Sequence, residues 1–426
     1  MNSSSSLVQP SAQVRERMEW SLPNGLTCVT VASPGRRTAG VTLTVRAGAA
    51  HEPDSRLGLA HLTEHVLAVQ VNGSYRPVDE TPNFQFHSKT DLELTQYSFV
   101  TVAEQLVPLL AFVRQFAAIK GTSKQQVDLA ARRVVDEQSR AAREPVHRVF
   151  ALLREGCHPS SRLSRSIHGT QDTVGRISAI DVLEWLARAH TPGNCSLSVV
   201  SPYSNDEISK PCATLFDDWA GCVPDFEGMS PEPFAPGYSM VAHGETNELL
   251  VVGFPGVAYG DQDYWALVLV ADMLAGAPSA TLFRKLRIER QLAYGTNAFF
   301  FPTSVNGVVA MYCSATSFHA MEALKEMLSI AHDLEVGKIG QAELDAARIR
   351  VRTRAAASAD QVQSHAEMLG RRWALEGSAI RDADMSGMDL VSTDDVSSAI
   401  RRLDWSKCRF IAGVGPLSTS NLDGLV

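Results

Sequence analysis

The sequence lacks the features that mark membrane, secreted and nucleic-acid-binding proteins. No apolar run among its 426 residues is long enough to span a bilayer, so we expect no membrane insertion. Residues 1–14 are rich in serine and lack a basic start followed by an apolar core, which predicts a disordered tail and not a secretion signal. The net charge of −8 at pH 7 argues against binding to nucleic acid.

Paired cysteine motifs are also missing. The seven cysteines are odd in number and scattered, with no Cys-x-x-Cys pair. Cys28 and Cys195 fall in strand-like apolar runs, where cysteine behaves as a small hydrophobic residue. This usage makes cysteine a poor candidate for a zinc ligand and predicts a reducing compartment, most simply the cytoplasm.

The sequence does contain a His-x-x-Glu-His motif, His61-Leu-Thr-Glu64-His65, in an otherwise apolar segment. Segment 57–69 is apolar nearly all round, which predicts a buried helix with both histidines on one face. Two neutral imidazoles so placed are a ready pair of zinc ligands, and Glu64 beside them could act as a general base. Polar side chains in an apolar helix need partners, so we favour metal binding over ordinary polar residues. The order of the motif is that of the inverted zincins.

A third zinc ligand is expected from the helix predicted at residues 123–142. Glu137 lies on the apolar stripe of this helix, where a carboxylate needs a cation or a hydrogen-bond donor. Zinc held by the two histidines would supply that charge, and a His-His-Glu set leaves a fourth coordination position open. An ion pair of Glu137 with an arginine of the same helix is the alternative, and Glu144 is the rival ligand.

The pattern of strands and helices occurs twice, with a repeat of about 200 residues. The first copy has strands at 18–22, 26–31, 38–45, 93–101 and 195–201, and helices at 57–69, 102–118, 123–142, 145–153 and 178–189. The second copy has strands at 239–242, 248–257, 294–301, 306–314 and 408–414, and helices at 262–274, 279–289, 320–334, 340–357 and 359–375.

A stretch rich in proline and glycine, 217–236, separates the two copies and predicts a linker. We therefore predict an α+β protein of two duplicated domains, 15–216 and 237–426, each with an antiparallel-rich sheet packed with helices. The second copy has no His-x-x-Glu-His motif, so one domain is expected to hold the metal.

With these motifs the chain resembles the pitrilysin-type inverzincin metallopeptidases, and within them the short-chain, two-domain branch that includes the mitochondrial processing peptidases and their bacterial relatives. The likeness runs almost end to end and includes segment 167–194, which is similar to the end of the family's first domain. It implies that His61, His65 and Glu137 bind one zinc ion per chain and that Glu64 is the general base.

The second half carries a further part of the resemblance. Segment 274–294, from Leu-Ala-Gly-Ala-Pro to Gln-Leu-Ala-Tyr, is close to a signature of the family's second domain. It implies that Arg287 and Tyr294 bind substrate, and both side chains can donate to a developing oxyanion. The residues alone also allow Arg287 to be a solvated helix residue and Tyr294 to be the first residue of a core strand.

The chain departs from the family pattern near the substrate-binding edge. Segment 70–86 lacks the Gly-Gly that normally precedes the edge strand, and His87-Ser-Lys-Thr90 stands where the family commonly has Asn-Ala-x-Thr. Thr90 is kept as an implied substrate contact, whereas His87 could contact substrate, approach the metal or be a spacer. The glutamate that the family often has seven residues before the third ligand is Ala130 here.

We predict a zinc endopeptidase that acts on peptides or unfolded leader segments, bound as an extended strand added to a sheet edge. The resemblance implies a closed chamber built from two such chains, as a homodimer or as a heterodimer with a related subunit. A non-catalytic partner subunit is the alternative function, against which the intact motif argues. A peptide-binding module with a structural zinc is a third.

Overall fold

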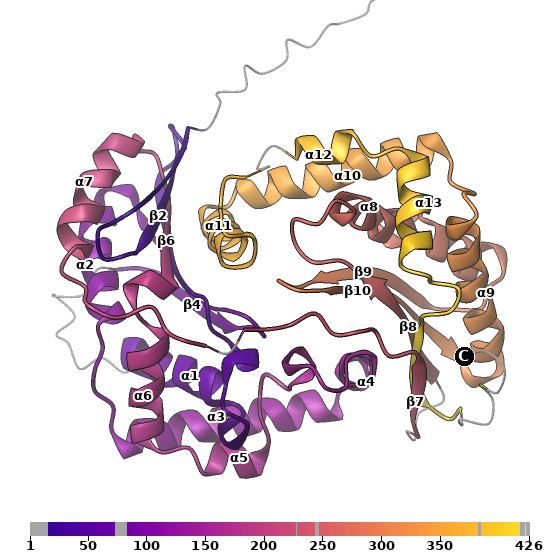
Figure 1. Cartoon of the computed structure of the whole chain (residues 1–426), viewed down its shortest axis with the longest axis horizontal. Helices are drawn as coiled ribbons and strands as arrows, with labels where there is room; N and C mark the ends of the chain where they lie inside the picture. The colour runs from indigo at the N-terminus through magenta and orange to yellow at the C-terminus, as the bar shows by residue number, and fades with distance from the viewer. Residues whose placement is uncertain are drawn as a thin grey trace, which may run out of the picture.

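The computed structural model describes residues 16–72, 83–226, 228–242, 247–381, 385–417 and 422. The predicted tail at 1–14 and most of segment 70–86 lie outside the described residues. The described chain forms two mixed sheets, each packed with helices, which confirms the predicted α+β class (Figure 1).

The first sheet has six strands in the order β1-β2-β6-β3-β5-β4. Their bounds are β1 (Arg17–Ser21), β2 (Thr27–Ala32), β3 (Thr38–Val45), β4 (Gln85–Thr90), β5 (Thr95–Val102) and β6 (Cys195–Ser201). The β2–β6 pair is parallel and the other pairs are antiparallel. The predicted hairpin is confirmed, because β1 and β2 pair from Arg17–Val31 to Ser21–Thr27, with Gly25 at φ +91° in the turn. Residue-level reasoning assigned no strand to β4, whose sequence Gln-Phe-His-Ser-Lys-Thr is largely polar.

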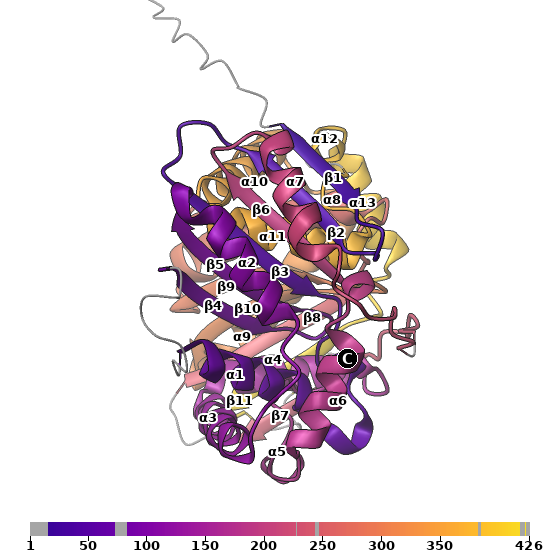
Figure 2. The ribbon, with the colours of Figure 1, turned by 90° about the vertical axis from the view of Figure 1, so that its left-hand side faces the viewer.

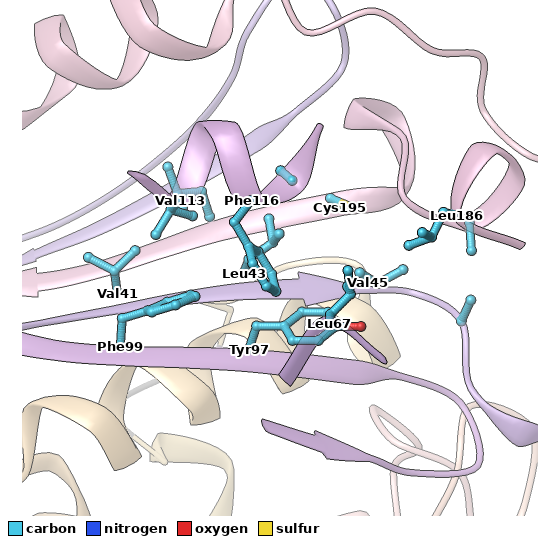
Figure 3. Packing of buried hydrophobic residues seen from close by; sticks show 14 of the residues in the cluster. Val41, Leu43, Val45, Leu67, Tyr97, Phe99, Val113, Phe116, Leu186 and Cys195 are labelled. Carbon is cyan, nitrogen blue, oxygen red and sulfur yellow. The ribbon is translucent and has the colours of Figure 1, made fainter. Parts of the chain in front are cut away.

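Helices of the first half cover one face of this sheet. They are α1 (Leu59–Asn72), α2 (Leu106–Ala117), α3 (Lys124–Arg143), α5 (Gln171–Gly175), α6 (Ala179–Ala189) and α7 (Asn205–Phe216). Figure 2 looks at this half from outside and shows α2 and α7 in front of the strands. Helix α7 was not predicted, because Pro211 in its interior is a helix-breaking signal; Ser204 and Glu207 cap its start. The core beneath these helices joins Val41, Leu43, Tyr97, Phe99 and Phe116 (Figure 3).

The second sheet has five strands in the order β7-β11-β8-β10-β9. Its strands are β7 (Gly237–Ala242), β8 (Asn247–Gly256), β9 (Gly295–Pro302), β10 (Gly307–Thr316) and β11 (Phe410–Gly415), of which β7 and β11 are parallel. Its helices are α8 (Tyr264–Ala275), α9 (Ser317–Glu335), α10 (Gln341–Ala359), α12 (Ser386–Asp389) and α13 (Thr393–Arg402). The helix predicted at 279–289 is mainly a π-helical segment, Phe283–Glu289.

The short 3-10 turns in the described part of the first half are Ala49–His51, Asp54–Arg56, Ala103–Gln105, Arg162–Ser164 and Pro192–Asn194.

Each half contributes one helix to the sheet of the other half, as Figure 1 shows. Helix α11 (Val362–Glu376) comes from the second half and packs on the first sheet, where its apolar side chains meet Val29, Val31 and Val200. Helix α4 (Pro145–Cys157) comes from the first half and packs on the second sheet against Val251, Phe410 and Ala412. The domain boundaries at 216 and 237 stay a prediction, and this exchange ties the two halves together by buried apolar contacts.

The packing of α11 on the first sheet makes a stability prediction at Gly40 in β3. A Cβ atom there would lie 2.6 Å from the carbonyl oxygen of Val362, and backbone cannot move aside cheaply. We expect Gly40→Ala to lower the free energy of unfolding by about 1–3 kcal/mol through overpacking. Urea denaturation measures this change. Gly121→Ala is the matched control, because a Cβ at Gly121 meets no atom within 4 Å; equal unfolding midpoints for the two variants would contradict the prediction.

Candidate metal centre

The metal-binding motif lies on α1, whose start is fixed by a buried carboxylate. Both oxygens of Glu52 accept backbone N–H bonds of 2.7 Å, one from Gly58 and one from Ala60. Ala60 lies in the first turn of the helix, where backbone N–H groups otherwise lack partners, and Gly58 immediately precedes the helix. Glu52 therefore sets where α1 begins and which way His61 and His65 face.

Three ligand atoms from α1 and α3 meet at one point. His61 Nε2 and His65 Nε2 are 3.1 Å apart, and Glu137 Oε2 lies 3.5 Å from the first and 3.3 Å from the second. Zinc bonds of about 2.0–2.1 Å in a tetrahedron place ligand atoms about 3.3 Å apart. The donor set and its spacing therefore fit a zinc ion.

Glu137 fits this role better than the other carboxylates. The ion pairs that the described residues make with Glu137 are those with His61 and His65. The rival, Glu144, is exposed at the junction of α3 and α4, where it precedes Pro145 as the N-cap of α4. Glu64 is 3.9 Å from His61 Nε2 and is held by other groups.

Glu64 is positioned by the edge strand β4. Its Oε1 accepts a 2.6 Å hydrogen bond from Ser88 Oγ, and its Oε2 accepts a 3.2 Å bond from Thr90 Oγ1. Burial raises the pKa of Glu64 above its usual value, and the two hydroxyl donors partly oppose this rise. A buried carboxylate with a raised pKa beside a metal centre is suited to act as a base. Ser88 was missed by sequence reasoning, although residues two apart in a strand share one face.

The imidazole of His61 is neutral. Burial and, to a smaller extent, the charges of His65 and His168 lower its pKa to about 3. A neutral ring offers a lone pair, which is the form that binds a metal.

His87 and Thr90 lie on opposite faces of β4. The side chain of His87 is 55% exposed and its Nδ1 lies 3.7 Å from Glu367 Oε1 on α11, where Lys89 donates a 2.8 Å bond to the same carboxylate. Ser88 and Thr90 instead face α1 and Glu64. His87 is therefore directed toward α11 and belongs to neither of the two groups of described side chains that could hold a metal ion, His61/Glu64/His65 and His61/Glu137/His168.

Arg287 and Tyr294 lie in the second half of the chain. The Arg287 guanidinium is 5.0 Å from the ring of Phe283, and Tyr294 is 66% exposed just before β9. Tyr294 is thus not a core residue. In the described chain neither side chain belongs to the groups that could hold a metal.

Sequence reasoning also missed the role of His168, which lies between α4 and α5. Its Nδ1 is 3.3 Å from Nδ1 of His61, and the ring centroids are 4.9 Å apart. Burial lowers the pKa of His168. A lone histidine more than a hundred residues along the chain gives no local signal of this contact.

All seven cysteines are unpaired. Among the described residues no helix combines the length and the apolar character needed to traverse a bilayer.

Family models and several known proteins are similar to this chain. A model described as "Insulinase (Peptidase family M16)" matches residues 27–171, and one described as "Peptidase M16 inactive domain" matches residues 176–351. An "Uncharacterized zinc protease" of Rickettsia bellii is 22% identical over 93% of this chain and 97% of its own length. A "Mitochondrial-processing peptidase subunit beta" of Lentinula edodes is 23% identical over 95% of this chain and 90% of its own.

Solved structures show the same fold. The crystal structure of a protease from Helicobacter pylori has a TM-score of 0.81 at 16% identity and covers 95% of this chain and 100% of its own. A chain of Complex III2 from Candida albicans has a TM-score of 0.81 at 17% identity and covers 96% of this chain and 97% of its own. Since the two family models together take in all of residues 27–351 except 172–175, the chain belongs to peptidase family M16, the insulinase family, and is a homologue of bacterial zinc proteases and of the beta subunit of mitochondrial processing peptidase.

Proposed function

We propose that this chain is a zinc-dependent endopeptidase that hydrolyses peptides or unfolded leader segments inside a closed chamber. The observation that carries the proposal is the convergence of His61, His65 and Glu137 at 3.1–3.5 Å with Glu64 beside them. Relatives that are named zinc proteases support the same chemistry.

His61, His65 and Glu137 would hold the zinc ion, which would supply a Lewis acid able to polarise a peptide carbonyl and to lower the pKa of water. Glu64 then takes the proton of the attacking water and returns it to the leaving amine. The hydroxyls of Ser88 and Thr90 hold both carboxylate oxygens, so the base is oriented before substrate arrives. Thr90 thereby acts on the reaction through Glu64 as well as at the substrate edge.

The substrate is proposed to add as an extended strand to the outer edge of β4. This strand is the last of the first sheet, so within the described residues one row of its backbone groups has no strand partner. Backbone pairing is tolerant of sequence, which suits unfolded segments. Alternate side chains of the bound strand would face Glu64 on one side and His87 with Glu367 on the other.

We infer that two chains form the working enzyme, as a homodimer in preference to a heterodimer with a related subunit. One chain carries both the zinc set and the Arg287/Tyr294 pair, yet within the described chain that pair is exposed and outside the metal-binding groups. A second copy that presents Arg287 and Tyr294 to the metal centre of the first would supply donors for the oxyanion.

Subunit complementation tests this arrangement. Glu64→Gln and Tyr294→Phe chains, each assayed alone, are expected to be poorly active. Co-expressed in equal amounts, they should recover about a quarter of wild-type activity, because half of the dimers are mixed and each mixed dimer has one intact composite site. If the Tyr294 hydroxyl served its own chain, or no site at all, mixing would add nothing to the sum of the separate activities.

A non-catalytic partner subunit is the alternative function. Zinc content of the purified chain, measured together with chelator-sensitive cleavage of a mixed pool of unfolded peptides, separates the two. We expect one zinc per chain and cleavage that stops on chelation. Zinc without cleavage would favour a missing partner subunit, and absence of zinc would favour a structural subunit.

The compartment is a separate proposal. Because all seven thiols are free, we infer a reducing compartment, most simply the cytoplasm.

A further inference from the structure

His168 contacts the ring of His61 on the side away from the other two proposed ligands. Its Nδ1 lies 3.3 Å from Nδ1 of His61, the ring nitrogen opposite the one that faces His65 and Glu137. A His168 ring nitrogen is also within 4.8 Å of a Glu137 carboxylate oxygen. One side chain therefore lies beside two of the three proposed ligands.

The loop that carries His168, together with α5, is held against the turn before α1 and against α3. On the α1 side, the Thr173 hydroxyl donates a 2.8 Å bond to the carbonyl of Leu57. Gly169 has a φ of +63°, and a Cβ there would lie 2.3 Å from the same carbonyl oxygen, so the backbones are in close contact. On the α3 side, Gln138, the residue after Glu137, donates a 2.7 Å bond to the carbonyl of Gly169.

We propose that His168 is a positioning residue of the zinc site. It accepts a hydrogen bond from the Nδ1–H group of His61 and so leaves Nε2 of His61 free for the metal. This inference rests on the proposed function. A contact between two ring nitrogens needs one donor and one acceptor. If His168 were the donor, neutral His61 would carry its hydrogen on Nε2, directed into the ligand cluster, and could not bind zinc there.

In the described chain, His168 is the polar side chain next to Nδ1 of His61. The hydrogen bond recorded at Nδ1 of His61 is the one with His168. Partners that orient a metal-bound histidine typically contribute about 10–100-fold to metal affinity or activity.

The test compares two variants of nearly equal shape. His168→Asn keeps an acceptor near the place of Nδ1, and His168→Leu removes it. Zinc affinity is measured by competition with a chromogenic chelator, together with kcat at saturating zinc and the melting temperature of the zinc-free proteins. We expect His168→Leu to bind zinc about 10–100-fold more weakly and His168→Asn to recover most of this loss. His332→Leu, at an exposed histidine of α9, is the control and should bind zinc as the wild type does.

The outcomes separate this inference from the proposed function. If the wild type binds no zinc, the proposed function fails. If the wild type binds zinc and His168→Leu binds it equally well, the positioning role is wrong while the peptidase stands. Equal losses in the Asn and Leu variants would assign the effect to ring packing, and a gain of activity in His168→Leu would mean that His168 obstructs the site; both results overturn the inference. Matching melting temperatures of the zinc-free Asn and Leu variants show that folding is not the cause of a difference between them.

Discussion

Replacing Glu64 by glutamine is expected to leave zinc bound and to lower kcat by about 10²–10⁴-fold, the usual contribution of a general base. Glutamine has the shape of glutamate, and its amide can still bond to the Ser88 and Thr90 hydroxyls that hold the native carboxylate. An amide cannot take a proton from water, so the loss falls on the chemical step. Steady-state kinetics on an unfolded peptide and the zinc content of the same sample measure both parts of this prediction.

The control is Glu184→Gln on the exposed face of α6, which makes the same chemical change away from the site. It should match the wild type in zinc content and in kcat. Activity retained in Glu64→Gln would refute the general-base role. Loss of zinc together with activity would instead mean that Glu64 belongs to the ligand set, as its 3.9 Å distance from His61 Nε2 would permit after a small shift.

Replacing Glu137 by glutamine is expected to weaken zinc binding by more than about 100-fold, because it removes the one charged ligand of three and even the outer partners of such ligands contribute about 10–100-fold. The Oε2 atom of Glu137 lies almost equally far from both histidine nitrogens. Any other described carboxylate would have to move to occupy this position. Chelator competition measures the affinity, and activity should return in part when zinc is supplied in excess.

Glu144→Gln is the matched control, because Glu144 lies seven residues further along and is the rival that the sequence left open. Its exposed place at the start of α4 predicts wild-type zinc affinity. If Glu144→Gln lost zinc and Glu137→Gln kept it, the assignment of the third ligand would be reversed.

Local patterns in the sequence determined much of the fold. The Asn24-Gly25 turn with its flanking strands, the apolar helix of the motif and the repeat of strands and helices all follow from short-range periodicity, and the structure has them within a few residues. Two of the elements that were not predicted lie where local and tertiary preferences differ. Pro211 is a helix-breaking signal inside α7, so this helix was not predicted. The sequence of β4 is polar, so the strand was not predicted although it pairs with β5 along its whole length.

The candidate site divides in the same way. His61, Glu64 and His65 are close because they share one helical face, so the sequence alone brings them together. The packing of α1 against α3 brought Glu137, and not Glu144, close to the two histidines, and the pairing of β4 with β5 brought Ser88 and Thr90 to Glu64. The loop held by Gln138 and Leu57 brought His168 to His61. The periodicity of the sequence determines which residues share a face of a helix or strand. A contact between distant segments depends on how those faces are buried against one another, and only the tertiary structure decides this.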